Sequence, residues 1–354
     1  MKKILLVATT PLGYDGISKV IKQLCLYTNY SNLKMELLVS EGASESYINE
    51  VKEKVNIHYS PSRKNEIINY FFYLYKLCYR EKYDIIHVHG NSATMCIDIF
   101  AAWIAKVPNR IAHSHNSSTK HIVFHRILKP FLNLFVNNPV ACSEVAGKWV
   151  FYRGFSIIKN GIEIDKYKFN EDSRRKIRKQ YGLENTFVIG HIGRFNYQKN
   201  HEFLINVFNL VLKENRKFKL FLIGEGELLE EIKTQVNLLG IRSSVAFIGN
   251  VDNIPDYLCA MDLFLLPSRF EGLPLVCIEA QTSGLPCIVS TAVSKETKIL
   301  DHFHFVDLNL NIWMKFINTS KMNLFRQRDF FKVKDRKFDI NDMIKSAIEV
   351  WNKY

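Results

Sequence analysis

The chain has 354 residues, of which 47% are hydrophobic and 23% are charged. This length and composition suit two folded domains with separate cores and exclude a disordered or fibrous protein. The formal net charge of +13 is compatible with a nucleic acid, a membrane surface or a phosphorylated substrate. Because the sequence contains no basic helix with interleaved aromatic residues and no nucleic-acid-binding motif, we expect no nucleic-acid partner.

The cysteines and the apolar segments indicate the compartment. Seven cysteines are scattered along the chain without a Cys-x-x-Cys pair, which favours a reducing cytosol over a disulfide framework. The first apolar run is only about five or six residues long, so it predicts a β-strand and not a signal peptide. No uncharged apolar stretch reaches the roughly 18 residues of a spanning helix. We expect a cytoplasmic protein that is soluble or peripheral on the inner face of the plasma membrane.

The chain opens with a strand, a glycine loop and a helix. Residues 3–9 read as the strand, Gly13 and Gly16 lie in the loop, and apolar residues at helical spacing follow from Ile17. This order cradles a phosphate in many folds, although a plain tight turn fits equally well. The full Gly-x-Gly-x-x-Gly pattern of a dinucleotide site is absent.

Two aromatic-rich segments with basic flanks, residues 65–80 and 120–136, read as helices. We favour two core helices whose lysine and arginine stems lie along apolar surface. The alternative is a basic, apolar patch that lies on a bilayer and meets a lipid-linked acceptor.

Two predicted strands each end in a pair of histidines. His87 and His89 share one face of the first strand, and His113 and His115 share one face of the second. Open α/β sheets bind ligands at the carboxyl ends of their strands, where these residues fall. A zinc site of four imidazoles is conceivable, but buried histidines at strand ends are the preferred interpretation because no acidic residue lies close in sequence.

An Asn-Gly turn at residues 160–161 is a natural hinge, and we place a domain boundary near Glu163. The expected limits are 1–163, 164–335 and a last helical segment, 336–354. After a strand at 187–192, Arg194 and Lys199 lie in a loop that leads into a helix from about residue 201. They can converge on one anion at that helix start, and ordinary surface charge is the alternative.

The stretch from 263 to 290 reads as a strand, a tight loop, a helix opened by Pro274 and a second strand, which is one βαβ unit. Glu271 lies in the loop and Glu279 about one turn inside the helix. The N–H groups at the helix start suit a phosphate, so the two carboxylates must face uncharged hydroxyls. A capping box from Ser268 is the alternative, which Gly272 and Pro274 disfavour.

Glu271 and Glu279 form a Glu-x7-Glu motif within Arg-Phe-Glu-Gly-Leu-Pro-Leu that resembles the signature of the retaining glycosyltransferases of family 4. The motif is especially similar to that of the family members that build exopolysaccharides and capsules. Two further segments carry the resemblance: Gly-Arg-x4-Lys-Asn at 193–200, and residues 157–165, where Lys159 replaces the usual proline. The resemblance covers about residues 3–298.

The resemblance implies the GT-B fold: two Rossmann-like, doubly wound α/β domains, with the acceptor on the first, the nucleotide sugar on the second, and a last helix that returns to the first domain. It implies a hexosyltransferase that moves a sugar from a nucleotide diphosphate donor with retention of configuration. The expected catalytic residues are Glu271, His115, Arg194 and Lys199, with His113 as the alternative histidine. The expected donor-binding residues are Gly13, Gly16, Gly193, Asn250, Val251, Gly272, Leu273, Leu275 and Glu279.

No metal and no cofactor are expected, because the sequence has no Asp-x-Asp motif and its cations can stabilise the leaving diphosphate. The resemblance favours a UDP-sugar donor and a glycan or lipid-linked acceptor. Three other functions stay open: a nucleotide-sugar epimerase or hydrolase on the same fold, a non-catalytic nucleotide-sugar-binding protein, and a metalloenzyme that uses the four histidines.

Overall fold

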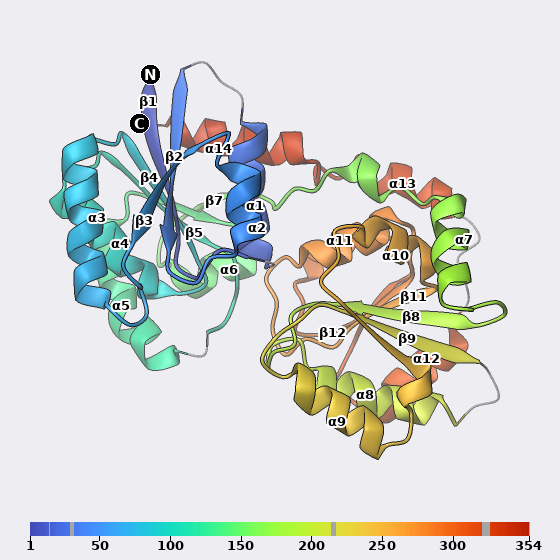
Figure 1. Ribbon diagram of the computed structural model, residues 1–354. Coiled ribbons are helices and arrows are strands. Elements are labelled where there is room, and N and C mark those ends of the chain that lie inside the picture. The colour runs from blue at the N-terminus through green and yellow to red at the C-terminus, as the bar shows by residue number, and fades with distance from the viewer. Residues whose placement is uncertain (14, 29–31, 120, 214–216, 321–325, 354) are drawn as a thin grey trace. The chain divides into compact units, whose positions relative to one another are not determined.

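The chain forms two compact α/β units (Figure 1). The computed structural model describes residues 1–354 except 14, 29–31, 120, 214–216, 321–325 and 354. One unit contains Met1–Gly161 together with Ile340–Tyr354, and the other contains Ile162–Asp339. The first unit is therefore built from the two ends of the chain, and the second is inserted between them.

Over its described residues, the first unit is built on a seven-stranded parallel sheet in the order β3-β2-β1-β4-β5-β6-β7. Its central strands are short apolar runs that are largely buried, as expected for a parallel sheet, whereas the edge strands β3 and β7 are partly exposed. The strands of this sheet are β1 (Lys2–Ala8), β2 (Leu33–Ser40), β3 (Asn56–Ser60), β4 (Ile85–Gly90), β5 (Asn109–Ser114), β6 (Asn138–Ala141) and β7 (Ser156–Ile157).

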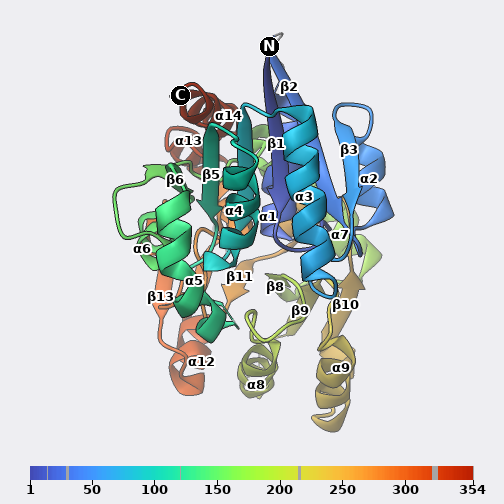
Figure 2. The same ribbon diagram turned by 90° about the vertical axis from the view of Figure 1, so that its left-hand side faces the viewer.

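Helices cover both faces of this sheet (Figures 1 and 2). The helices α3 (Ile67–Glu81), α4 (Cys96–Ile104) and α5 (Ile122–Phe135) share one face and one apolar core with β1, β4 and β5. The opposite face carries α1 (Gly16–Tyr27), α2 (Glu45–Val51) and the last helix, α14 (Ile340–Trp351), which packs beside α1. The 3-10 turn η1 (Ala93–Met95) and α6 (Glu144–Val150) follow β4 and β6.

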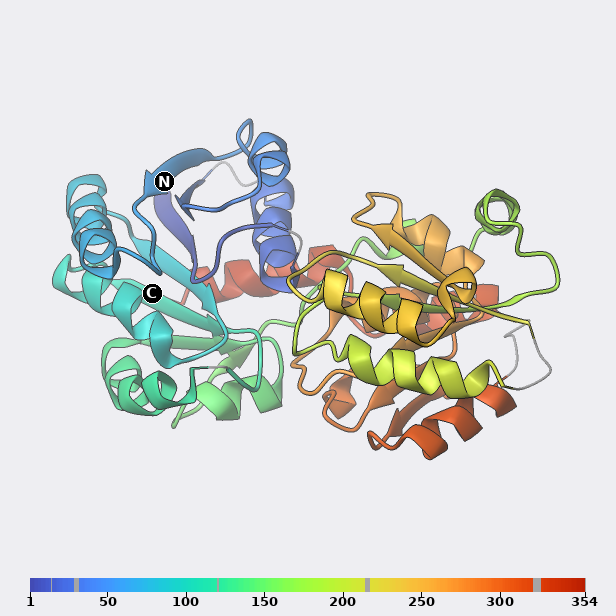
Figure 3. The ribbon, with the colours of Figure 1, turned by 60° about the horizontal axis from the view of Figure 1, so that its bottom comes forward.

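The second unit has, over its described residues, a six-stranded parallel sheet in the order β10-β9-β8-β11-β12-β13. The strands are β8 (Phe187–Ile192), β9 (Phe218–Ile223), β10 (Val245–Gly249), β11 (Leu263–Leu266), β12 (Cys287–Ser290) and β13 (Phe303–Val306). Figure 3 shows α8 (His201–Val211) and α9 (Leu229–Leu238) side by side along one face, where α12 (Leu310–Thr319) also packs against α8.

The remaining helices of the second unit are α7 (Glu171–Gln180), α10 (Ile254–Ala260), α11 (Leu275–Thr282) and α13 (Arg326–Lys334). Helix α10 packs against α7, and α11 packs against α13. The described part of this unit also contains the short 3-10 turns η2 (Ile164–Tyr167), η3 (Arg242–Ser244) and η4 (Lys295–Thr297).

In each sheet the strand order reverses once. In the first sheet the reversal lies between β1 and β4, and in the second it lies between β8 and β11. The loops that leave such a pair of strands run to opposite faces, so a crevice opens at the carboxyl ends of the two strands. This topology confirms the predicted doubly wound fold and identifies where each unit can bind a ligand.

Several predicted elements have the observed bounds, while the last part of the chain was not anticipated. The predicted strands at 187–192 and 263–266 coincide with β8 and β11. The sequence analysis assigned no elements between 301 and 339, where β13, α12 and α13 lie. Asn309 caps α12 through its side chain, and Trp313 and Ile317 form its buried face, so a helical signal was present there.

The sequence analysis used two features, the apolar stretches and the cysteines, to predict the compartment, and the structure describes both. Within the described part of the chain, no helix combines the length and hydropathy that a bilayer crossing requires. All seven cysteines are buried, free thiols.

Candidate functional site

Two loops meet at the reversal point of the second sheet, where β8 and β11 are neighbours. Residues 193–200 follow β8 and residues 267–274 follow β11. The Arg269 N–H donates to the Gln198 carbonyl at 2.8 Å, and the Gln198 side-chain amide donates to the Phe270 carbonyl at 3.1 Å. The Asn200 amide donates to the Pro267 carbonyl at 3.1 Å. These bonds hold the two loops in one fixed arrangement.

A buried ion pair joins the same loops. Lys199 Nζ lies 2.6 Å from Glu271 Oε1, and the two side chains are only 16% and 8% exposed. The Ser268 hydroxyl donates to the same carboxylate oxygen at 2.8 Å. The structure thus brings together two residues that are 72 positions apart and that the sequence analysis had singled out. Ser268 binds the carboxylate and does not cap a helix, because α11 begins at Leu275 with Pro274 at its N-cap.

Glu279 lies inside α11 and is also buried, at 5% exposure. Burial raises the pKa of the nearby Cys277 thiol most, the charges of Cys287, Glu271 and Glu279 raise it further, and the charge of Lys199 lowers it. Two carboxylates and one ammonium group therefore act on one point of the α11 start. Gly272, Leu273 and Leu275, which lie between the two glutamates, are buried as well.

Arg194 differs from Lys199 in its surroundings. Its side chain is 60% exposed and its Nε lies 3.3 Å from Glu227 Oε2. Glu227 belongs to the loop that follows β9, the neighbour of β8 on the other side. The two cations that were predicted to converge on one anion are thus paired with different carboxylates in this structure. The sequence analysis did not identify Glu227 as the partner of Arg194, and it considered Ser268 only as a possible helix cap.

Glycines allow the loops after β8 and β9 to approach closely. Gly224 has φ +133°, and a Cβ there would lie 2.3 Å from the Gly193 carbonyl oxygen. A Cβ at Gly193 would press on the carbon stem of Lys199 at 3.0 to 3.1 Å. Both positions therefore favour glycine, and Gly193 leaves the space that the lysine needs to reach Glu271.

Asn250 and Val251, the predicted nucleobase contacts, follow β10 at the same edge of the sheet. Asn250 is exposed and Val251 is half-buried. The Gly224 N–H donates to the Gly249 carbonyl at 2.9 Å, which ties this loop to the loop after β9.

In the first unit, the glycine loop after β1 contains its own helix cap. Asp15 Oδ1 accepts hydrogen bonds from the N–H groups of Ile17 at 2.9 Å and Ser18 at 3.0 Å. The Gly13 N–H donates to the Ser18 hydroxyl at 2.9 Å. Gly16 is the first residue of α1. The negative charge of Asp15 thus already occupies the start of α1, which its position before an apolar helix could have indicated.

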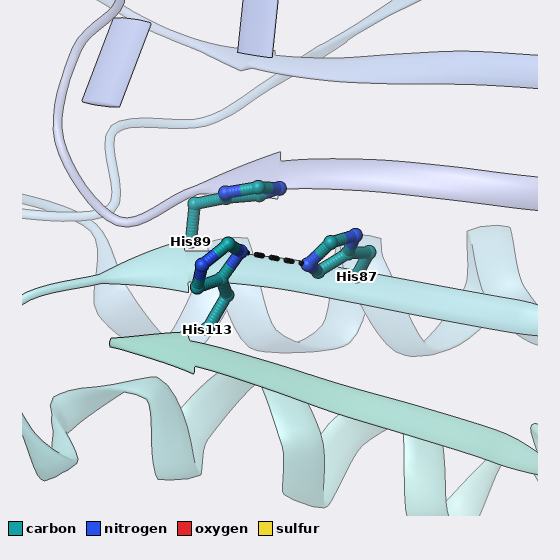
Figure 4. A group of neighbouring side chains, drawn as sticks. All are labelled: His87, His89 and His113. Carbon is teal, nitrogen blue, oxygen red and sulfur yellow. Dashed lines mark hydrogen bonds between the residues drawn. The ribbon is translucent and has the colours of Figure 1, made fainter. Parts of the chain in front are cut away.

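The four predicted histidines form one buried group at the ends of β4 and β5 (Figure 4 shows three of them). His87 Nε2 lies 3.2 Å from His113 Nδ1, and His89 Nδ1 lies 2.9 Å from His115 Nε2. Within the described residues, nitrogens of His87, His89 and His113 lie within 4.8 Å of one another, close enough to raise the question of a metal site.

Hydrogen bonding accounts for the spacing of His87 and His113 without a metal. The Trp351 indole N–H, which can only donate, lies 3.2 Å from His87 Nδ1. His87 Nδ1 must therefore accept, so a neutral His87 carries its proton on Nε2 and donates it to His113 Nδ1. Both facing nitrogens are then used in one hydrogen bond, whereas metal binding requires a free lone pair on each ligand nitrogen.

Burial also sets the charge of this group. It lowers the pKa of His87 to about 3 and that of His115 to about 3, and it lowers the pKa values of His89 and His113 well below the ordinary value. The charges of neighbouring histidines lower the pKa values of His87, His89 and His113 further, because two adjacent imidazolium ions repel each other. At neutral pH the four rings are neutral hydrogen-bonding groups.

The overall fold has a counterpart of the same size among solved structures. Anabaena Alr3699/HepE in complex with UDP-glucose superposes with a TM-score of 0.82, and the match covers 100% of both chains at 20% sequence identity. Identity this low establishes the fold alone, which is the GT-B arrangement of two doubly wound α/β units that the sequence analysis expected.

Sequence similarity identifies the family. Residues 173–306 match the family described as "Glycosyl transferases group 1". The UDP-Gal:alpha-D-GlcNAc-diphosphoundecaprenol alpha-1,3-galactosyltransferase of Escherichia coli is 30% identical over 262 residues, which are 69% of this chain and 67% of that protein. The chain belongs to the group 1 family of glycosyltransferases.

Two other relatives are similar over different lengths. The putative glycosyltransferase EpsF of Bacillus subtilis (strain 168) is 31% identical over 60% of this chain, and the match spans 59% of EpsF, less than two thirds of its length. The capsular polysaccharide biosynthesis glycosyltransferase CapH of Staphylococcus aureus is 26% identical over 84% of each chain. Relatives of this chain thus include a protein named for capsular polysaccharide biosynthesis.

Proposed function

We propose that this protein is a retaining hexosyltransferase that moves a sugar from a UDP-sugar to a lipid-linked saccharide during the assembly of a bacterial surface polysaccharide. The observation that carries the proposal is the Lys199 to Glu271 ion pair at the reversal point of the second sheet. A buried cation and a buried carboxylate at the mouth of a helix offer one group for a phosphate and one for sugar hydroxyls.

The proposed chemistry depends on where charge develops. When the bond between the anomeric carbon and the diphosphate breaks, negative charge grows on the leaving group and positive charge on the sugar ring. Lys199, Arg194 and the N–H groups of Gly272, Leu273 and Leu275 stabilise the diphosphate. Because these groups supply the positive charge, we propose that transfer does not depend on a metal ion.

The glutamates act on the uncharged parts of the donor. Glu271 accepts hydrogen bonds from sugar hydroxyls near the anomeric carbon, and Glu279 accepts them from the ribose diol. Gly193 gives Lys199 its space, while Asn250 and Val251 contact the nucleobase. In the first unit, we propose His115 as the histidine that contacts the sugar or the phosphate, and Gly13 and Gly16 as further donor contacts.

Two relatives support the choice of substrates. HepE binds UDP-glucose, and the Escherichia coli relative transfers galactose to a diphosphoundecaprenol-linked sugar, as their names state. Because such an acceptor lies in a membrane, we propose a cytoplasmic protein that contacts the inner face of the plasma membrane. The seven free thiols are consistent with that compartment.

The direct test is a screen of nucleotide sugars by thermal shift, followed by transfer assays with the stabilising donor and a lipid-linked saccharide. We expect a glycosylated lipid product whose new linkage has the anomeric configuration of the donor, as measured by NMR. Glu271→Ala, Arg194→Ala and Lys199→Ala should each lower turnover at least about tenfold, since loss of one such group typically costs 10² to 10³ in rate.

Near-normal turnover in all three variants would contradict the site. Incubation with donor alone distinguishes the other functions: sugar isomerisation identifies an epimerase, and rapid release of free sugar identifies a hydrolase. Binding of UDP without transfer to any acceptor identifies a non-catalytic binding protein. Loss of activity in chelator contradicts metal independence.

A further inference from the structure

The outward face of α5 has an unusual composition. Val123, Phe124, Ile127, Phe131 and Leu134 are each at least 51% exposed. At 100° per residue, these five positions fall within an arc of about 100° on the helix surface. We call this set the α5 apolar face. The opposite side of the helix is also used, because His125 and Leu132 are buried in the unit.

A surface helix normally turns polar side chains to water. Here the side away from the core is as apolar as the side that packs on it. Contiguous exposed apolar surface of this kind marks an interaction site and not a random feature of a protein surface. The α5 apolar face therefore requires an occupant.

The helices α3 and α4 lie next to α5 on the same side of the sheet (Figure 2) and add exposed apolar side chains. Trp103 and Ile104 on α4 are 46% and 39% exposed, and the Trp103 ring lies 4.9 Å from that of Phe135 on α5. On the other side of α4, Phe71 of α3 packs against Phe100, and the adjacent Phe72 is more than half exposed. The three helices thus form one continuous layer with aromatic rings at its outer edge.

The part of the sequence that carries the α5 apolar face is mostly basic, although Glu144, which pairs with Lys148 at 3.3 Å, is half exposed. Between residues 85 and 161 the sequence contains eight basic and only two acidic side chains. One of the acidic residues, Asp98, is buried and paired with Arg63 at 2.8 Å, so it contributes no exposed negative charge. The basic residues are Lys106, Arg110, Lys120, Arg126, Lys129, Lys148, Arg153 and Lys159.

We propose that the α5 apolar face docks on an anionic lipid bilayer, with its five side chains among the acyl chains and the nearby lysines and arginines at the headgroups. A helix of this length spans about 21 Å and can lie along the interface. Charge complementarity favours this occupant over a second copy of the chain, because two copies would bring like charges together. The inference extends the proposed function by naming the surface that meets a lipid-linked acceptor.

The test compares vesicle binding by the full-length protein and a double variant, Ile127→Glu/Phe131→Glu. Both side chains are exposed, so the substitutions leave the core intact. Leu238→Glu is the matched control, because Leu238 on α9 is 84% exposed and lies in the other unit. Co-sedimentation is measured with vesicles of phosphatidylcholine alone and of phosphatidylcholine with phosphatidylglycerol. Near-UV circular dichroism verifies that each protein is folded.

We expect the wild type and Leu238→Glu to bind the anionic vesicles and to bind the neutral vesicles only weakly. The double variant should bind the anionic vesicles at least tenfold more weakly than the wild type. Equal binding by the double variant and the wild type overturns the proposal. A lack of binding by the wild type also overturns the proposal. If sedimentation velocity then shows a dimer that the double substitution dissociates, the face binds a second copy of the chain instead. Because the readout does not require catalysis, docking can stand when no transfer is found, and transfer to a soluble acceptor can stand when docking fails.

Discussion

Arg194 and Lys199 belong to the same loop, but the structure gives them different roles in stability. Lys199 is buried against Glu271, whereas Arg194 is largely exposed and makes a long contact with Glu227. A buried charge that loses its partner remains desolvated, while an exposed pair contributes little to folding. A loss of turnover therefore has a different meaning in an Arg194 variant, whose stability should be unchanged, than in a Lys199 variant, whose stability should fall.

We expect Arg194→Ala to lower turnover without a measurable change in the free energy of unfolding, because exposed pairs contribute at most about 1 kcal/mol. Lys199→Ala should lower that free energy by about 3 to 5 kcal/mol, since it strands the Glu271 carboxylate. Urea unfolding of the purified variants measures both effects. The double variant Lys199→Met/Glu271→Gln should recover much of the lost stability while it stays inactive.

If the double variant is less stable than Lys199→Ala, the two side chains do not form a buried pair, and the arrangement proposed for the donor would be wrong. Equal stability of Arg194→Ala and Lys199→Ala would contradict the difference in burial between the two cations.

Sequence reasoning identified Lys199 and Glu271 because each stands at a helix mouth in a motif of fixed spacing. It considered Ser268 only as a helix cap, and it did not find Glu227 or Trp351 as partners, because their contacts join elements that are far apart in the sequence. A pairing such as Trp351 with His87 joins residues 264 positions apart, and no local pattern encodes it.

At the level of elements, the ends of β4 and β5 concentrate buried titratable groups. His87, His89, His113 and His115 all have a pKa below the ordinary value, because burial disfavours the imidazolium form. An unfolded chain, in which a histidine has a pKa of about 6.5, therefore binds more protons below that pH than the folded protein does. The stability that these residues contribute is fully present above pH about 6.5 and decreases as the pH falls towards about 3.

We expect His113→Gln to reduce the loss of stability between pH 6.5 and pH 4 by up to about 1.4 kcal/mol per pH unit, since one such histidine fewer is protonated on unfolding. Urea unfolding at several pH values measures the slope. His121→Gln, at an exposed position, is the matched control for the substitution itself. An unchanged slope in His113→Gln would show that this ring is protonated in the folded protein.

The elements that the sequence predicted well are those with a single strong signal. Apolar runs bounded by glycine or proline predicted β8, β11 and β12. Helix α13 gave no such signal, because its first residue is a buried arginine. Arg326 donates to the carbonyls of Ser283, Cys259, Met261 and Leu258 and to the Ser283 hydroxyl. A buried charge that is held mostly by backbone oxygens cannot be inferred from hydropathy.

At the level of the whole molecule, the first unit depends on the last fifteen residues of the chain. Helix α14 buries Met343, Ile344 and Trp351. The Asn138 amide of β6 donates to the Val350 carbonyl at 3.1 Å, and Trp351 donates to His87 of β4. The helix thus contributes both apolar contacts and hydrogen bonds to two strands of the first sheet.

We expect truncation after Asp339 to unfold or loosen residues 1–161 while residues 162–339 stay folded. Removal of α14 exposes apolar side chains and leaves buried polar groups of the first unit without partners. Hydrogen exchange measured by mass spectrometry should show lost protection in β4 and β6 and native protection in β8 and β11. Native protection throughout would contradict a structural role of α14.

Because the two ends of the chain share one unit, the order of synthesis has a consequence. A ribosome makes β1 to β7 first, yet α14, which completes their fold, is made only after the whole of the second unit. The inserted unit has its entire sequence before then and can fold while translation continues. Residues 1–161 therefore lack α14 until the second unit has been synthesised, and the apolar surface that this helix covers stays exposed for that time, which is when a chain is prone to aggregate.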